Sequence, residues 1–169
     1  TMKDASPESY KLDTVTARKA FEISSNVGMA KLVSKHYSSR TEANEEKAAA
    51  QFIERLKEFN LHLPVGIEIA GEASPFIKEA YSDEDRWSGT TLPWMSIGYE
   101  LRLTPLQLLT FYNAIANDGR MMKPYLVDRV ERYGEALETF KPTVVDRRIA
   151  SPESIDHMQG LLQGVVDSG

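Results

Sequence analysis

The apolar residues of the N-terminal half recur at the three- and four-residue spacing of amphipathic helices. Thr16 can cap a first helix, which the polar run Ser24, Ser25, Asn26 interrupts. A second helix is predicted over residues 26–37, capped by Ser25 or Asn26, with one face made of Met29, Leu32, Val33 and His36. The strongest periodicity predicts a third helix, closed by Asn60, with an apolar face of Ala49, Phe52, Ile53, Leu56 and Phe59.

Between this helix and residue 103 the pattern predicts irregular structure. Residues 66–72 alternate apolar and acidic positions between glycines, which is typical of a short extended segment and a turn. Residues 73–93 are predicted to form a loop that packs against the body through Tyr81, Trp87 and Pro93, since burial of aromatic rings can offset the entropy lost on ordering.

The next helix has both a start and a stop signal. Thr104 is its predicted N-cap, Pro105 occupies the first helical position, Gln107 completes a capping box and Gly119 follows the end. Its buried stripe is predicted to consist of Leu108, Phe111, Tyr112 and Ile115.

The C-terminal part is predicted to hold a hairpin and a last helix. Residues 124–133 alternate as a strand, a turn follows at Gly134, and the partner strand is expected within residues 139–149. The last helix should run over residues 151–167, with an apolar face of Ile155, Met158, Leu162 and Val165.

Composition narrows the possible functions. The chain has 169 residues, 41% of them hydrophobic, and a net charge of −5, which suits one globular domain or part of one and argues against nucleic acid as a partner. It has no cysteine, and no apolar run of the roughly 20 residues that cross a bilayer. Residues 1–15 are predicted to be an irregular lead-in.

Most side chains that could carry chemistry have a simpler interpretation. His36, His62 and His157 lack metal-ligand spacing, and the acidic pair Glu45–Glu46 and the run 82–85 are interpreted as solvated charge, so no metal site is predicted. The remaining candidate is the S-x-N pattern of Ser24 and Asn26, which by itself is typical of an ordinary joint between two helices.

The surroundings of this joint resemble a known family. TARKAFEISSNVGMAKL at residues 16–32 resembles the segment around the second motif of penicillin-binding transpeptidases, whose motif set is S-x-x-K, S-D-N and K-T-G. Three further stretches resemble the family in the same order: GIEIAGEAS at 66–74, WSGTTLPWMSIGYELRLTPLQLLTFYNAIANDGRMMKP at 87–124 and SPESIDHMQGLLQGVVDSG at 151–169.

The resemblance implies roles for two residues of the joint. Ser24 is expected to be the second-motif serine, whose hydroxyl hydrogen-bonds the first-motif lysine and helps return a proton to the leaving group. Asn26 is expected to hold that lysine and the amide carbonyl of the substrate through its side-chain amide. Both would be catalytic and substrate-binding residues, Ser25 would be the variable middle residue, and no metal or cofactor is implied.

The chain also departs from the family pattern. No serine is followed by lysine three positions later, and no Lys-Thr-Gly or Lys-Ser-Gly triplet occurs. We therefore expect residues 1–169 to be the part of a transpeptidase domain between the first and third motifs, inactive alone. Glu100 and Asp118 stand where the family more often has glycine.

The resemblance implies a class B penicillin-binding protein of the cell-division or elongation type. The expected fold is α+β, a mostly helical fragment of the serine β-lactamase and penicillin-binding fold, in which a helical subdomain lies beside an αβα sheet subdomain. The parent would cross-link peptidoglycan stem peptides through an acyl-serine and bind β-lactams, with membrane cell-wall synthesis proteins as partners. It would lie in the cell envelope, at the outer face of the cytoplasmic membrane, anchored by an N-terminal membrane helix absent from this chain.

Two alternatives stay open from the residues alone. A β-lactam-sensing domain shares the fold but signals instead of turning over. A non-catalytic helical interaction module would use the serines only as a helix joint, so that Ser24→Ala would remove a cap and lower stability by about 1 kcal/mol. A fragment with uncovered apolar surface is expected to self-associate or to be marginally stable.

Overall fold

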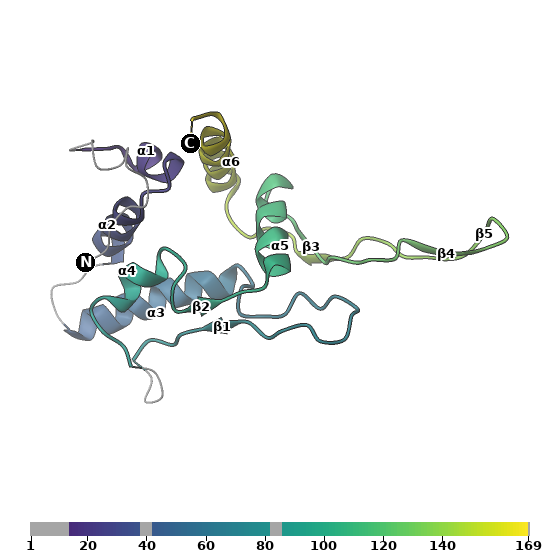
Figure 1. Cartoon of the computed structure of the whole chain (residues 1–169), viewed down its shortest axis with the longest axis horizontal. Coiled ribbons are helices and arrows are strands. Elements are labelled where there is room, and N and C mark those ends of the chain that lie inside the picture. Colours follow the sequence, from purple (N-terminus) through teal and green to yellow (C-terminus); the bar gives the residue numbers. More distant parts are fainter. Residues whose placement is uncertain (1–13, 38–41, 82–85, 169) are drawn as a thin grey trace.

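A computed structural model describes residues 14–37, 42–81 and 86–168. Within these ranges the chain forms six helices and three two-stranded antiparallel sheets (Figure 1). The predicted lead-in falls almost wholly outside the described residues, and so does the acidic run 82–85. No helix in the described ranges is long and apolar enough to cross a membrane.

The first three helices match the predicted pattern. They are α1 (Ala17–Glu22), α2 (Asn26–Tyr37) and α3 (Glu42–Glu58). Thr16 caps α1 by accepting a hydrogen bond from the Lys19 N–H at 3.1 Å. Asn60 follows α3 with a φ of 59°, a left-handed conformation that asparagine tolerates, so it closes the helix as predicted.

The middle of the chain is more regular than its sequence predicts. The strands β1 (Phe76–Ile77) and β2 (Leu101–Arg102) pair, and the short helix α4 (Thr91–Met95) lies between them. The prediction of a loop over residues 73–93 was therefore wrong for β1 and α4, which are too short to give a periodic signal. Residues 66–72 form no strand; instead Glu72 accepts hydrogen bonds from the Val65 and Gly66 N–H groups at 2.7 and 3.0 Å.

Helix α5 (Pro105–Ala116) begins with the predicted capping box. Its predicted buried stripe is only partly right, because Ile115 is buried whereas Leu108 and Tyr112 are 42% and 50% exposed. The helix instead buries Gln107, which donates a hydrogen bond to the Leu63 carbonyl at 2.8 Å, and Thr110 and Ala114. Leu108 and Tyr112 therefore stay about half exposed, and self-association through such surface stays a prediction.

Two strand pairs follow α5. Strand β3 (Met121–Met122) pairs with β6 (Val144–Asp146), and between them β4 (Arg129–Arg132) and β5 (Glu135–Thr139) form a hairpin that extends away from the helices (Figure 1). The turn at Gly134 was predicted correctly. The expected partner within residues 139–149 was wrong, because the chain reverses at once into β5, whose residues are exposed and lack the alternation of a half-buried strand.

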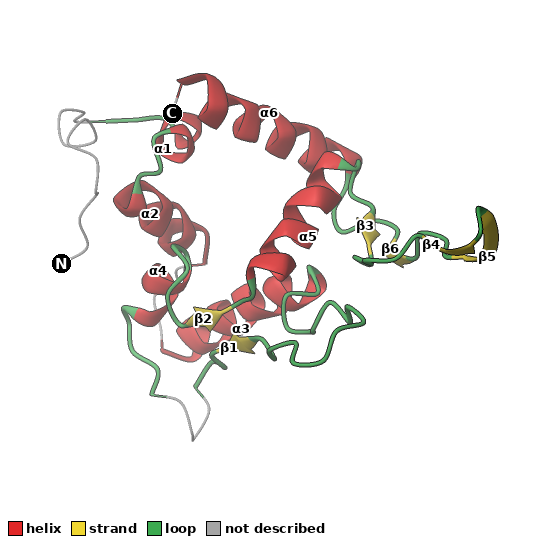
Figure 2. Ribbon diagram, turned by 45° about the vertical axis from the view of Figure 1, so that its right-hand side comes forward, coloured by secondary structure: helices red, strands yellow, loops and turns green. Residues whose placement is uncertain are grey.

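Helix α6 (Pro152–Ser168) completes the fold and its hydrophobic core. Three residues of its predicted apolar face, Ile155, Met158 and Leu162, pack with α5 and β3, whereas Val165 is not part of this cluster. The cluster is made of Ala114, Ile115, Met121, Ile149 and Ile155, bordered by Phe59, Phe111, Ala150, Met158 and Leu162. Figure 2 shows the helices around the rim of a ring, in which α6 runs from the end of α5 to α1.

The two departures from the family pattern lie in left-handed turns. Glu100 and Asp118 have φ values of 59° and 53°, conformations that favour glycine. The Glu100 carboxylate lies 3.2 Å from the ammonium of Lys78, a lysine that is otherwise buried, so its side chain has a function that glycine cannot supply. At Asp118 the side chain accepts a hydrogen bond from the Gln159 amide at 3.4 Å.

We expect Gly119→Ala to destabilise the fold by about 1–2 kcal/mol, because Gly119 has a φ of 84° and a Cβ there would lie 3.2 Å from Ile155 in the core. Gly89→Ala is the matched control, since a Cβ at Gly89 meets nothing within 4 Å and its φ is not positive. Urea unfolding of the two variants measures the difference. Equal stabilities would contradict the assigned role of Gly119.

Candidate functional site

The joint between α1 and α2 begins with a tight reversal of the backbone. The Ser25 N–H donates to the Ala20 carbonyl at 2.8 Å, and the Ser24 N–H donates to the Phe21 carbonyl at 3.0 Å. These two bonds define a Schellman motif, which ends a helix by placing one residue in the left-handed region. That residue is Ser24, with a φ of 53°.

Ser24 is an unusual residue for this position. The same turn closes α3 with Asn60 and α5 with Asp118, and short side chains of the Asn and Asp type tolerate left-handed backbone best after glycine. A serine there costs about 1–2 kcal/mol relative to an unstrained conformation. Strain of this kind in a non-glycine residue is a reason to look for function at that side chain.

Ser25 carries out the structural task of the joint. Its hydroxyl accepts a hydrogen bond from the Gly28 N–H at 2.9 Å, and the residue is 4% exposed, so Ser25 is the N-cap of α2. The sequence left the cap open between Ser25 and Asn26, and the structure assigns it to Ser25. Ser24 is exposed and caps neither helix, which removes the basis for expecting a lost cap in Ser24→Ala.

Gly28 allows α2 to approach α1 closely. A Cβ on Gly28 would lie 2.7 Å from the Ala20 Cβ and 2.9 Å from the Ser25 hydroxyl oxygen, both too short for real contacts. The small residues Ala20 and Gly28 therefore fix the angle at which the chain leaves the turn. The position of Asn26, the first residue of α2, is fixed as a result.

The two predicted site residues lie two positions apart on this rigid joint. Ser24 is exposed and Asn26 is half-buried, and within the described part of the chain neither side chain has a hydrogen-bond partner. A hydroxyl can both donate and accept a proton, and a carboxamide can donate and accept hydrogen bonds. The pair can therefore relay a proton and hold an amide, if a substrate and a base are brought to the joint.

Helix α6 supports the joint from the side of α1, which sequence reasoning missed. Glu22 lies against Gly164, where a Cβ would come within 2.5 Å of its carboxylate oxygen, and Arg18 lies 3.7 Å from the equivalent point on Gly160. The side chain of Glu22 is 12% exposed and lies 3.6 Å from Arg18 and 3.8 Å from Lys19. The spacing of four between Gly160 and Gly164, one helical turn, was the available signal.

Other titratable groups contribute to the scaffold. Partial burial alone would lower the pKa of the Lys57 ammonium, but its hydrogen bonds to Glu79 and Glu54 outweigh burial, so the pKa is raised. The contact with Glu79, with a nitrogen–oxygen distance of 3.1 Å, ties α3 to the segment after β1. Among the described residues no group of His, Cys, Asp and Glu could hold a metal ion.

Solved penicillin-binding proteins share this arrangement of helices. Penicillin-binding protein 2B from Streptococcus pneumoniae strain R6 superposes with a TM-score of 0.78 at 19% identity, covering 99% of this chain and 28% of that chain. Penicillin-binding protein 3 from Mycobacterium tuberculosis, in its complex with aztreonam, superposes with a TM-score of 0.67 at 28% identity, covering 91% of this chain and 31% of that one. The fold is therefore the mostly helical part of a penicillin-binding protein, as the sequence predicted.

Sequence comparison identifies the family to which the chain belongs. The family model described as the penicillin-binding protein transpeptidase domain matches residues 2–169, and the chain belongs to this family. The penicillin-binding protein PbpB of Mycobacterium tuberculosis is 28% identical over 116 residues, which are 69% of this chain. Penicillin-binding protein 2A of Bacillus subtilis is 28% identical over 118 residues. The chain spans about a sixth of the length of these relatives, 16% of each.

The two serines of the joint are expected to respond differently to substitution. Ser25→Ala should destabilise the fold by about 1 kcal/mol, because the Gly28 N–H loses its cap. Ser24→Gly should be no less stable than wild type, because glycine relieves the left-handed strain. Denaturant titrations followed by circular dichroism check both, and a larger loss in Ser24→Gly than in Ser25→Ala would contradict the assignment.

Proposed function

We propose that residues 1–169 form the segment of a peptidoglycan D,D-transpeptidase domain that carries its second catalytic motif, Ser24 and Asn26. The observation that supports this most strongly is the division of tasks at the joint. Ser25 alone caps α2, while Ser24 stays exposed in a strained conformation that glycine would adopt more easily. The exposed Ser24 hydroxyl, which has no structural task at the joint, is therefore available to a substrate.

The proposed reaction takes place in two transfers. A serine outside residues 1–169 attacks the carbonyl of the penultimate D-alanine of a stem peptide, and the terminal D-alanine leaves as the amine. The amine of a second stem peptide then attacks the acyl-serine and forms the cross-link. A β-lactam reacts in the first transfer only, because its ring nitrogen is the leaving group and stays attached.

Each residue of the pair has a distinct task in this reaction. The Ser24 hydroxyl passes a proton to the departing nitrogen and receives one from the lysine that serves the nucleophile, so its own protonation state is restored. The Asn26 carboxamide donates a hydrogen bond to the amide carbonyl of the substrate and accepts one from the same lysine. The rigid turn places both groups before the substrate arrives, which lowers the entropy lost in reaching the transition state.

The same proposal implies ligands, partners and a location for the whole protein. Solved structures of penicillin-binding protein 3 from Mycobacterium tuberculosis hold aztreonam or ampicillin, and the relatives are named as penicillin-binding proteins. We propose peptidoglycan stem peptides and β-lactams as ligands, membrane cell-wall synthesis proteins as partners, and a location at the outer face of the cytoplasmic membrane with an N-terminal membrane anchor. The segment by itself should be inactive, since the nucleophile and its base are not among its residues.

The acylation rate of the full-length protein by benzylpenicillin, followed by intact-mass spectrometry, tests the roles of Ser24 and Asn26. Ser24→Ala and Ser24→Gly should slow acylation by about 100-fold or more, because the proton relay is lost. Asn26→Ala should slow it by about tenfold or more, because a transition-state hydrogen bond is lost.

Ser25→Ala is the matched control, since it removes the same hydroxyl one residue away. It should acylate at close to the wild-type rate in spite of its lower stability. If Ser24 and Asn26 variants acylate like wild type, or if only Ser25→Ala is slow, the proposed roles are wrong.

A further inference from the structure

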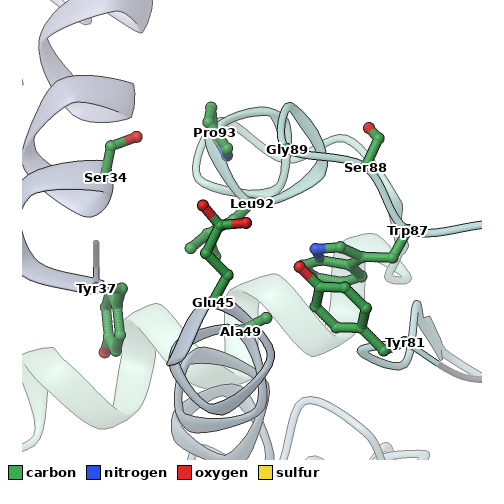
Figure 3. Close-up of a pocket in the computed structure, with 10 residues that line it drawn as sticks. All are labelled: Ser34, Tyr37, Glu45, Ala49, Tyr81, Trp87, Ser88, Gly89, Leu92 and Pro93. Carbon is green, nitrogen blue, oxygen red and sulfur yellow. The ribbon is translucent and has the colours of Figure 1, made fainter. Parts of the chain in front are cut away.

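A second site lies at the other end of α2. A pocket of about 200 Å³ opens between the last turn of α2, the first half of α3 and the segment that leads into α4 (Figure 3). Ser34, which lines it, follows Asn26 by eight residues, or about 12 Å along a helix. The pocket is therefore separate from the joint that carries Ser24, and nothing in the proposed transpeptidase reaction uses it.

Aromatic rings form two sides of this pocket. Tyr81 and Trp87 stack with ring centroids 5.5 Å apart and an angle of 30° between their planes. Tyr37 lies on the other side of Glu45 in Figure 3, and Phe52 supports it edge-on at 5.5 Å. The face of an aromatic ring carries partial negative charge and attracts cations, most strongly when the ring is tryptophan.

The charge of the pocket favours the same kind of ligand. Among the described residues that line it, only Glu45 is charged, and Leu92, Pro93 and Ala49 supply apolar surface. Within the described ranges Glu45 makes no ion pair, although Lys47 is close to it in sequence. A carboxylate placed between aromatic rings disfavours an anion and complements an ammonium group with an apolar body.

We propose that this pocket binds an alkylammonium group, either a quaternary ammonium or the primary ammonium of a lysine-like side chain. Trp87 and Tyr81 supply the cation–π surface, and Glu45 supplies the opposite charge. The proposal adds a binding role to Glu45, which is exposed, in agreement with its interpretation as solvated charge. It extends the predicted packing of Tyr81, Trp87 and Pro93, since these three residues line the pocket together instead of filling it.

Choline and its uncharged isostere 3,3-dimethylbutan-1-ol test the proposal, because they share a shape and differ in charge. Ligand-observed NMR on the full-length protein should give a dissociation constant for choline about tenfold lower than that of the isostere. N-acetyl-lysine methylamide, measured in the same way, distinguishes a peptide side chain from a free quaternary amine as the preferred source. Equal binding of choline and the isostere would overturn the proposal.

Substitutions of the lining residues test whether choline binds in this pocket. Trp87→Leu and Glu45→Gln should each weaken choline binding by about fivefold or more, whereas Glu46→Gln, a neighbouring exposed residue that does not line the pocket, should leave it unchanged. Wild-type choline affinity in both pocket variants would also overturn it. Acylation by benzylpenicillin should stay at the wild-type rate in Glu45→Gln, so this test and the test of Ser24 fail independently of each other.

Discussion

The chain passes from α1 to α2 through one residue in the left-handed region, and the position of the proposed site depends on that turn. Backbone hydrogen bonds from Ser24 and Ser25 close the end of α1, and the Ser25 hydroxyl starts α2 within the same few residues. Two helices joined this tightly leave little freedom in the direction of the side chains between them. Ser24 and Asn26 are therefore held in place by backbone hydrogen bonds and by the Ser25 cap, without using their own side chains.

Small residues transmit this constraint to the rest of the fold. Gly28 lets α2 lie against Ala20 of α1, and Gly164 lets α6 lie against Glu22. Helix α6 in turn packs on α5 in the hydrophobic core cluster. The joint is thus connected to the well-packed core through two close helix contacts. A substitution that displaces α6 is therefore expected to shift Ser24.

The sequence predicted the elements whose signals are local and strong. Thr16, Thr104 and Pro105 marked helix starts correctly, and the S-S-N-V-G segment led to the family that the comparisons confirm. Leu108 and Tyr112 were assigned to the core because helical periodicity identifies an apolar face but not what covers it. Strand β5 was missed because its residues are exposed on both faces, so no alternation indicates it. At the site, residue type alone does not show which of the two adjacent serines caps α2 and which lies in the left-handed region. Only the backbone conformation assigns the cap to Ser25 and the strained position to Ser24.

The position of the covalent adduct on the full-length protein tests most directly whether Ser24 assists a nucleophile located elsewhere. After reaction with benzylpenicillin, proteolysis and mass spectrometry should locate the penicilloyl group on a serine outside residues 1–169, and residues 1–169 alone should take up none. An adduct on Ser24, or on any other serine of this segment, would contradict its role as a proton relay.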